Sequence, residues 1–425
     1  MHTPQYRPAT PPLPLRKAPS KAAYHRNKRL VKKGALIEPI PGHFIETYYW
    51  LSLPAEQKNQ ALIFALAYDH PYWPVASFSA AVLLGAELSE EMTTRYCSNV
   101  YFASDQHTRM HPRKSLPIDF IFLKDSHMYT RIDEALRGRN RCATSIFTSG
   151  KNATSLYTSI TDTIGILNGL IVTSPMHTIL TIMRENIPCE DSLQICDELA
   201  RLYHITVEDL IRFLNTRSSC HDYQLLLYKL SLINPLSENG GESHARALMI
   251  KEGFEAPTLQ VSIPNPLYDP HLPREESHRR HNTKTMRPDF LWLLDSKGKI
   301  CHDTLTTPLP EGYHCIIAEM DGFDKYRNDV MLSRSNARDS KDKWYQEKDR
   351  DVALQALGYT VLHFSYDDVI ENNGRRVREL LELAGIPHIS AEEQKLRAYL
   401  NKKFSDTSLL ITHTPKKPPT YDLWD

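Results

Sequence analysis

From residue 242 onward, two kinds of apolar periodicity alternate in an order that few folds can accommodate. The order is helix, strand, strand, strand, helix, strand, helix. In that order the segments are 242–253, 258–263, 289–294, 313–319, 343–358, 359–364 and 374–385. This alternation predicts an α/β domain in which helices pack on a central sheet.

The third of these strands ends in two carboxylates. Glu319 and Asp321 are two positions apart, so strand alternation predicts that they face together while Met320 faces the core. Close carboxylates raise one another's proton affinity unless a cation lies between them, and oxygen ligands suit hard cations. Asp289 opens the preceding strand, and Glu242 begins a helix whose apolar face points toward the sheet. These four carboxylates therefore predict a site for Mg²⁺ (or Mn²⁺).

Residues 236–387 resemble PD-(D/E)xK restriction-endonuclease-like domains, in their very-short-patch-repair-like branch. The resemblance rests on Pro288-Asp289, on Glu319 in "AEMDG" and on "EKDRDVALQALGYTVLHF". It implies a central mixed sheet flanked by helices and a Mg²⁺-dependent endonuclease.

The same resemblance assigns roles to further residues. Gln260 would orient the attacking water, and Glu242 would bind a metal-ligated water or a second cation. Where the family often has a lysine that polarises the scissile phosphate, this chain has Asp321. Lys325, four positions later, is the candidate for the missing positive charge. The catalytic assignment therefore stays open at this point between a working and an inactive nuclease.

The N-terminal end is strongly basic although the formal net charge of the chain is +0. Residues 1–33 contain nine Lys or Arg and no Asp or Glu. Proline enrichment predicts disorder over 1–20, whereas a basic helix from Lys21, a stop at Gly34 and a hairpin with strands 35–39 and 43–46 are expected next. This is how a winged helix-turn-helix module ends, although a generic helix and hairpin fits equally well.

This first part of the chain resembles AbiEi-like antitoxin and regulator proteins. The resemblance rests on "LVKKGALIEPIPGHFI", "SAAVLLG" and "VTSPMHTIL". Basic side chains here, and in a loop ahead of Asp289, are candidates for nucleic-acid binding, and a solvated surface is the alternative. The candidates are Arg26, Lys28, Arg29, Lys32, Lys33, Arg279 and Arg280.

Composition shifts divide the chain into a tail, three regions and a second tail, and the fold class expected is α/β. The expected ranges are 1–20 (disordered tail), 21–95 (helical, partly winged-helix-like), 96–235 (mixed α/β, ending in helices), 236–390 (nuclease-like) and 391–425 (charged tail).

Composition narrows the function classes. No apolar run approaches the roughly 18 residues that a membrane span needs, and no signal-peptide pattern opens the chain, so a cytoplasmic protein without a membrane partner is expected. Seven cysteines without C-x-x-C spacing support neither a disulfide framework nor a thiolate zinc site.

The leading hypothesis is a Mg²⁺-dependent DNA endonuclease, which the resemblance connects with phage defence or a toxin–antitoxin context. The alternative is a non-enzymatic DNA-binding regulator or antitoxin with an inactive nuclease fold. RNA cleavage stays open as well, as do the target and the oligomeric state.

Overall fold

The computed structural model describes two compact units with mixed α/β structure. The chain divides between Pro235 and Leu236. The described residues are 15–105, 117–123, 128, 130, 132–133, 164–167, 170–185, 187–216, 223–273, 276–277, 282–301, 305–321 and 340–395. No helix in these ranges is long and apolar enough to cross a membrane.

The first unit begins with a small basic module. Helix α1 (Lys21–Lys32) is capped by the Ser20 side chain, which accepts from the Ala23 N–H. Strands β1 (Arg16–Lys17), β2 (Leu36–Ile40) and β3 (His43–Glu46) form an antiparallel sheet in the order β1-β3-β2, and α2 (Thr47–Ser52) follows. The predicted basic helix and hairpin are confirmed. Gly42 lies in the hairpin turn with φ +84°, a conformation that favours glycine.

The rest of the first unit packs helices around short strands. The helices are α3 (Ala55–Asp69), α4 (Ser77–Leu83), α5 (Glu90–Tyr96), α7 (Pro175–Arg184), α8 (Cys189–Tyr203), α9 (Val207–Asn215) and α10 (Tyr223–Ser231). The strands are β4 (Val100–Ser104), β5 (Ile118–Phe122), β6 (Ile164–Leu167) and β7 (Leu170–Thr173). Val75 bridges to both Phe102 and Val172, which links the β4-β5 pair to the β6-β7 pair.

The second unit contains the predicted order of elements. It has α11 (Gly240–Lys251), α14 (Ser340–Ala356), α15 (Tyr366–Ile370), a 3₁₀ turn (Glu371–Gly374) and α16 (Arg375–Leu383). Its strands are β8 (Thr258–Leu259), β9 (Ile263–Pro264), β10 (Thr285–Met286), β11 (Phe290–Leu294), β12 (His314–Asp321) and β13 (Thr360–Ser365). Four of them form a mixed sheet in the order β13-β12-β11-β8, in which β12 and β13 are parallel and are joined through α14.

One predicted strand is divided. Residues 258–263 were expected to be continuous, but Gln260 adopts φ +53°, and the chain leaves the sheet there. Leu259 pairs with Phe290 in the main sheet, whereas Ile263 pairs with Met286 in the separate β9-β10 ribbon. The left-handed conformation of Gln260 is incompatible with a strand, so the backbone turns at this residue.

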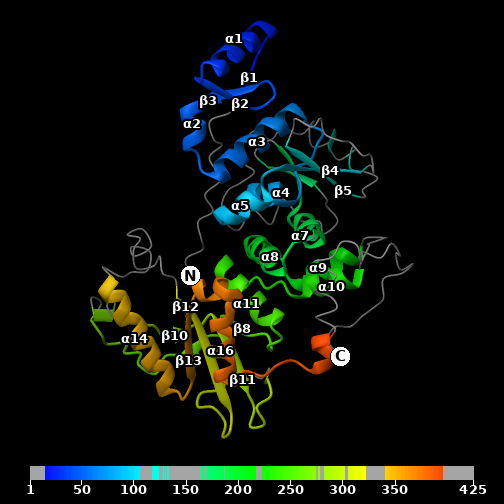
Figure 1. Ribbon diagram of the computed structural model, residues 1–425. Helices are drawn as coiled ribbons and strands as arrows, with labels where there is room; N and C mark the ends of the chain where they lie inside the picture. The colour runs from blue at the N-terminus through cyan, green and yellow to red at the C-terminus, as the bar shows by residue number, and fades with distance from the viewer. Residues whose placement is uncertain are drawn as a thin grey trace. The chain divides into compact units, whose positions relative to one another are not determined.

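The two faces of the sheet are covered by different helices (Figure 1). On one face, Phe290, Trp292 and Phe364 pack with residues of α11 and α16. On the other face, Leu291 and Ile317 pack with residues of α14. The sheet is therefore a middle layer, and each strand sends alternate side chains to opposite sides.

Candidate active site

The two carboxylates of β12 lie on the α14 side of the sheet. Ile316 and Ala318 belong to the core beneath α11 and α16, and Met320 packs against it. Glu319 and Asp321 alternate with these residues and point to the opposite face, where they meet partners from α14 and β13. The prediction that the two acids face together while Met320 faces the core is confirmed.

Asp289 is placed next to Glu319 by the pairing of β11 with β12. Phe290 pairs with Ala318 in the antiparallel ladder, so one step further along Asp289 stands opposite Glu319. The Met320 N–H donates to Asp289 Oδ2 over 2.9 Å. This hydrogen bond fixes Asp289 at the strand end.

Arg350 reaches these carboxylates from α14. Its Nη2 atom donates to Glu319 Oε1 over 2.5 Å and to the carbonyl oxygen of Arg287 over 2.6 Å. The Arg350 and Glu319 side chains are 21% and 14% exposed, so the ion pair is mostly screened from water. Ala353 and Leu354, three and four positions later on α14, are core residues, which explains why Arg350 faces inward.

His363 of β13 lies between two further carboxylates. Its Nδ1 atom is 3.3 Å from Asp321 Oδ1, and its Nε2 atom is 3.1 Å from Asp351 Oδ1. The hydrogen bond with Asp321, together with the charges of both acids, raises the pKa of His363 to about 9. A protonated imidazole thus offsets the negative charge of Asp321.

The pKa of Glu319 is shifted mainly by burial. Burial raises its pKa to about 7, the charge of Asp289 acts in the same direction, and Arg350 opposes both. The effect of burial on Glu319 therefore outweighs the opposing charge of Arg350.

These side chains line one open cleft of about 410 Å³. Among the described residues around it, carboxylates outnumber basic groups. The acids are Glu238, Asp289, Glu319, Asp321, Glu347 and Asp351, and the basic residues are Arg287, Arg350 and His363. Gln260 also lines the cleft, so the divided strand delivers its amide to the predicted site. A left-handed, non-glycine residue at such a position is often retained for function.

The structure does not bring Glu242 into this cleft, contrary to the sequence prediction. Glu242 is buried on α11, and its carboxylate accepts from the Glu238 N–H over 2.7 Å and from Asn239 Nδ2 over 2.5 Å. Backbone N–H groups and the positive end of the helix dipole attract a carboxylate to this first turn. Glu238, which the sequence analysis missed, lines the cleft instead. The predicted Lys325, Arg279 and Arg280 lie outside the described residues.

The described carboxylates suit a water-rich metal site better than a closed cage. Among the described residues, no three His, Cys, Asp or Glu side chains are grouped so that they could hold a metal ion. Mg²⁺ keeps several waters and binds through one or two carboxylates plus substrate phosphates. Asp289 and Glu319 are two such carboxylates on neighbouring strands of the cleft.

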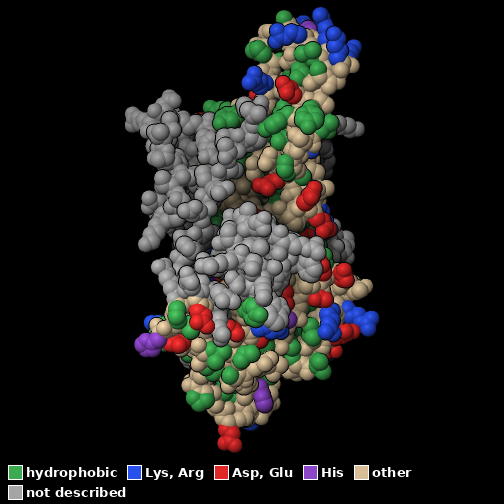
Figure 2. All heavy atoms as spheres, turned by 90° about the vertical axis from the view of Figure 1, so that its left-hand side faces the viewer, with side chains coloured by type: hydrophobic (Ala, Val, Ile, Leu, Met, Phe, Trp, Pro, Cys, Tyr) green, Lys and Arg blue, Asp and Glu red, His purple; other side chains and the backbone are tan. Residues whose placement is uncertain are grey.

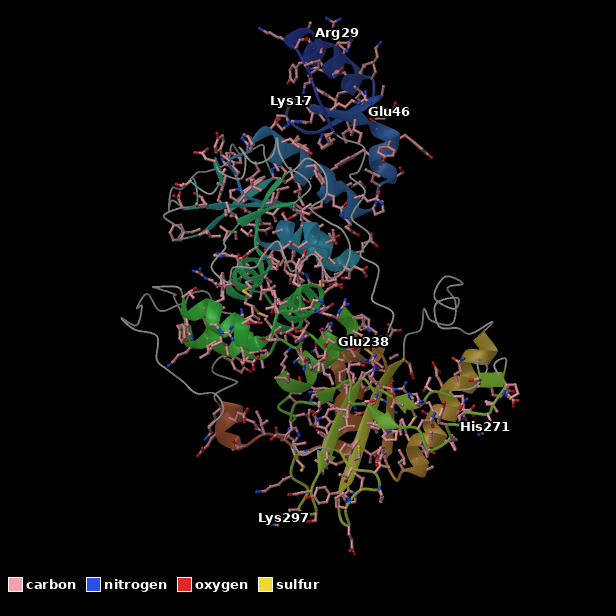
Figure 3. All side chains as sticks on the ribbon, turned by 180° about the vertical axis from the view of Figure 1, so that it is seen from behind. Lys17, Arg29, Glu46, Glu238, His271 and Lys297 are labelled. Carbon is pink, nitrogen blue, oxygen red and sulfur yellow. The ribbon has the colours of Figure 1, made fainter. Side chains whose placement is uncertain are left out.

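The predicted nucleic-acid residues of α1 are arranged on one side of the helix. Arg29 and Lys32 are three positions apart, and Arg26 and Lys33 extend the same exposed stripe. Lys21, which was not among the predicted residues, continues it. Figure 2 shows Lys and Arg side chains gathered on this end of the first unit, and Figure 3 shows Arg29 on α1. The buried Ala23 lies on the opposite side of the helix.

Lys28 differs from the other basic residues of α1. Its Nζ donates to Glu38 Oε2 of β2 over 2.6 Å, and this hydrogen bond raises the Lys28 pKa. Lys28 therefore joins the helix to the hairpin. The exposed stripe for a polyanion consists of Lys21, Arg26, Arg29, Lys32 and Lys33.

No protein-family model matches the chain, and neither does any curated protein or solved structure. Any assignment of function therefore depends on the residues themselves and on the geometry described above.

Proposed function

We propose that the chain is a metal-dependent endonuclease that hydrolyses phosphodiester bonds in DNA. The observation that carries the proposal is the cleft in which Asp289, Glu319 and Asp321 line one wall and Arg350 is bound to Glu319. A hard-cation site beside a fixed guanidinium is suited to an anionic phosphate centre.

The arrangement of elements supports the same proposal. A helix, three strands, a helix and a strand parallel to its neighbour occur in this order around a mixed sheet. The acids lie at the end of β12 and at the start of the antiparallel β11, so they lie at the same end of these two neighbouring strands. This resembles the order expected for a PD-(D/E)xK core, and we assign that fold to the second unit as part of the proposal.

The chain's own residues have separable tasks in this reaction. Asp289 and Glu319 would hold Mg²⁺ or Mn²⁺, with Asp321 sharing it, and the ion would supply charge stabilisation and a more acidic water. Gln260 places an amide at the cleft to orient the attacking water. In the hydrolysis, the water oxygen bonds to phosphorus, one phosphorus–oxygen ester bond breaks, and the departing oxygen takes up a proton.

The test combines metal titration with cleavage. Isothermal titration of Mn²⁺ into the full chain should show binding that Asp289→Ala removes and that Glu311→Ala, a change at an exposed acid outside the cleft, leaves intact. Supercoiled, linear and mismatched DNA and a matched RNA should then be incubated with Mg²⁺ or Mn²⁺. We expect DNA cleavage by wild type and by Glu311→Ala, with at least 100-fold slower cleavage by Asp289→Ala and Glu319→Ala. Cleavage that survives both cleft substitutions would contradict the proposal.

A DNA-binding regulator is the second candidate, and the exposed basic stripe on α1 favours it. The same experiment separates the two functions. A regulator would bind DNA with equal affinity in wild type and Asp289→Ala, and neither protein would cut it. Preferential cleavage of the matched RNA would instead assign the cleft to an RNA substrate.

A further inference from the structure

The cleft is lined by carboxylates, so binding of a phosphate there requires a positively charged side chain that faces the substrate. An anionic phosphodiester cannot approach a wall of carboxylates unless positive charge faces it. Asp321 adds negative charge on β12 and is paired with His363, so this strand position supplies no cation for the substrate.

The basic side chains described around the cleft differ in their contacts with carboxylates and in their exposure. The two ring nitrogens of His363 both face carboxylates, Asp321 and Asp351. Arg287 forms an ion pair of 2.7 Å with Glu238, and its side chain is 57% exposed. Arg350 is less exposed and closer to the predicted ligands, since it is bound directly to Glu319.

Arg350 is held through one of its two terminal nitrogens. Both of its hydrogen bonds to described residues use Nη2, one to Glu319 and one to the Arg287 carbonyl. A guanidinium has five N–H donors, and these two bonds account for the two donors of Nη2, which leaves two on Nη1 and one on Nε. The Nε atom is buried without a hydrogen-bond partner in the structure.

We propose that Arg350 is the phosphate-binding residue of the cleft and that it presents the N–H donors of Nη1 to the scissile phosphodiester. This inference rests on the proposed nuclease function and assigns the positive charge to a helix residue. Glu319 and the Arg287 carbonyl hold the plane of the guanidinium, which reduces the entropy lost when it binds an anion. A charge-assisted hydrogen bond from Nη1 to a phosphate oxygen is stronger than a bond between neutral groups.

The first measurement is metal-free binding of a dinucleotide with one phosphodiester, titrated into the full chain. Arg350→Gln should weaken this binding at least tenfold. Arg287→Gln removes another cleft arginine and should change it less than threefold. Lys325→Gln, at the rival position from the sequence, should also change it less than threefold. Equal loss in Arg287→Gln, or a loss confined to Lys325→Gln, would overturn the assignment.

Arg350→Lys covers the case in which Arg350→Gln does not fold. Lysine keeps a positive charge for Glu319 but has a single nitrogen in place of Nη2 and Nη1, so we expect a melting temperature near that of wild type and at least fivefold weaker dinucleotide binding. Unchanged binding in a folded Arg350→Lys variant would contradict a phosphate contact through Nη1.

Cleavage kinetics separate this inference from the function on which it rests. If wild type cuts DNA, Arg350→Gln should lower kcat/KM at least 100-fold at saturating Mn²⁺, and wild-type rates in that variant would refute the role of Arg350 alone. If wild type does not cut any nucleic acid, the nuclease proposal fails, and the dinucleotide titration still decides whether Arg350 binds phosphate.

Discussion

At the residue scale, the acids of β12 are not equivalent although they share a face. Glu319 meets a guanidinium from α14, whereas Asp321 meets an imidazole from β13. Burial keeps the pKa of Glu319 near neutrality, and Asp321 is more exposed. Glu319 is the more buried of the two acids, and the proposed function pairs it with Asp289 as a metal ligand.

Gly374 provides a residue-scale test of the core that supports the cleft. It precedes α16 with φ +69°, and a Cβ added there would lie 2.1 Å from Leu248 Cδ2 of α11. Gly374→Ala should therefore combine backbone strain with overpacking and lower the free energy of unfolding by about 3 kcal/mol. Urea unfolding followed by circular dichroism measures this loss.

Gly385 is the matched control for that substitution. Its φ is +79°, but nothing lies within 4 Å of an added Cβ. Gly385→Ala should therefore cost only the left-handed strain, about 1 to 2 kcal/mol. If the two variants lose the same stability, Leu248 moves aside freely and does not resist a side chain at position 374.

At the element scale, periodicity was sufficient for most elements of the second unit. The 3.6-residue and two-residue patterns located α11, β11, β12 and β13 because their apolar faces are continuous. They could not locate the break in 258–263, because a left-handed Gln260 has no signature in apolar spacing. Glu242 was misplaced for a similar reason: the spacing predicted burial but not that its carboxylate would turn back to the helix N-terminus.

The same apolar patterns could have identified Arg350 and His363 as side chains of the cleft. Arg350 precedes Ala353 and Leu354 by three and four positions, which places a charged residue on the buried face of α14. His363 is two positions after Val361, so both lie on the face of β13 that packs against α14. Which acids they meet depends on the parallel pairing of β12 with β13, and that contact joins residues far apart in the sequence.

A buried lysine links two helices of the first unit and gives a prediction at this scale. Lys229 of α10 donates from Nζ to the carbonyl oxygens of Met183 and Glu185, at the end of α7. Burial lowers the pKa of Lys229 from 10.5 to about 8. Between these two values the unfolded chain holds a proton that the folded protein has released, so stability contributed by this group rises with pH.

Comparison with Lys229→Met isolates this pH dependence. From about pH 8 to pH 10.5, the free energy of unfolding of wild type should rise relative to that of Lys229→Met, with a slope of at most about 1.4 kcal/mol per pH unit. Urea unfolding at several pH values measures the difference. Lys32→Met, a change at an exposed position, should show no such relative trend. A constant difference between wild type and Lys229→Met across this range would contradict the assignment.

At the scale of the whole molecule, the two candidate nucleic-acid surfaces lie on different compact units. The basic stripe belongs to the unit that ends at Pro235, and the cleft belongs to the unit that begins at Leu236. Covalent linkage raises the effective concentration of one surface for a DNA already held by the other. The stripe would then contribute affinity without sequence preference, and the cleft would contribute chemistry.

If the basic stripe on α1 supplies most of the phosphate contacts, it also causes most of the salt dependence of DNA binding. The formal net charge of the chain is +0, so general attraction of a polyanion to the whole molecule is weak. The slope of log affinity against log salt concentration is negative. Replacing Arg26, Arg29 and Lys33 by alanine should reduce the magnitude of this slope by about 2 to 3, close to one unit per lost phosphate contact. Fluorescence anisotropy of a labelled duplex across a salt series measures the slope. The matched control replaces Arg375, Arg376 and Arg378 of α16, two of which pair with Glu379 and Glu252, and should leave the slope near the wild-type value. An equal fall in both variants would mean that total charge, and not the stripe on α1, governs the contact with DNA.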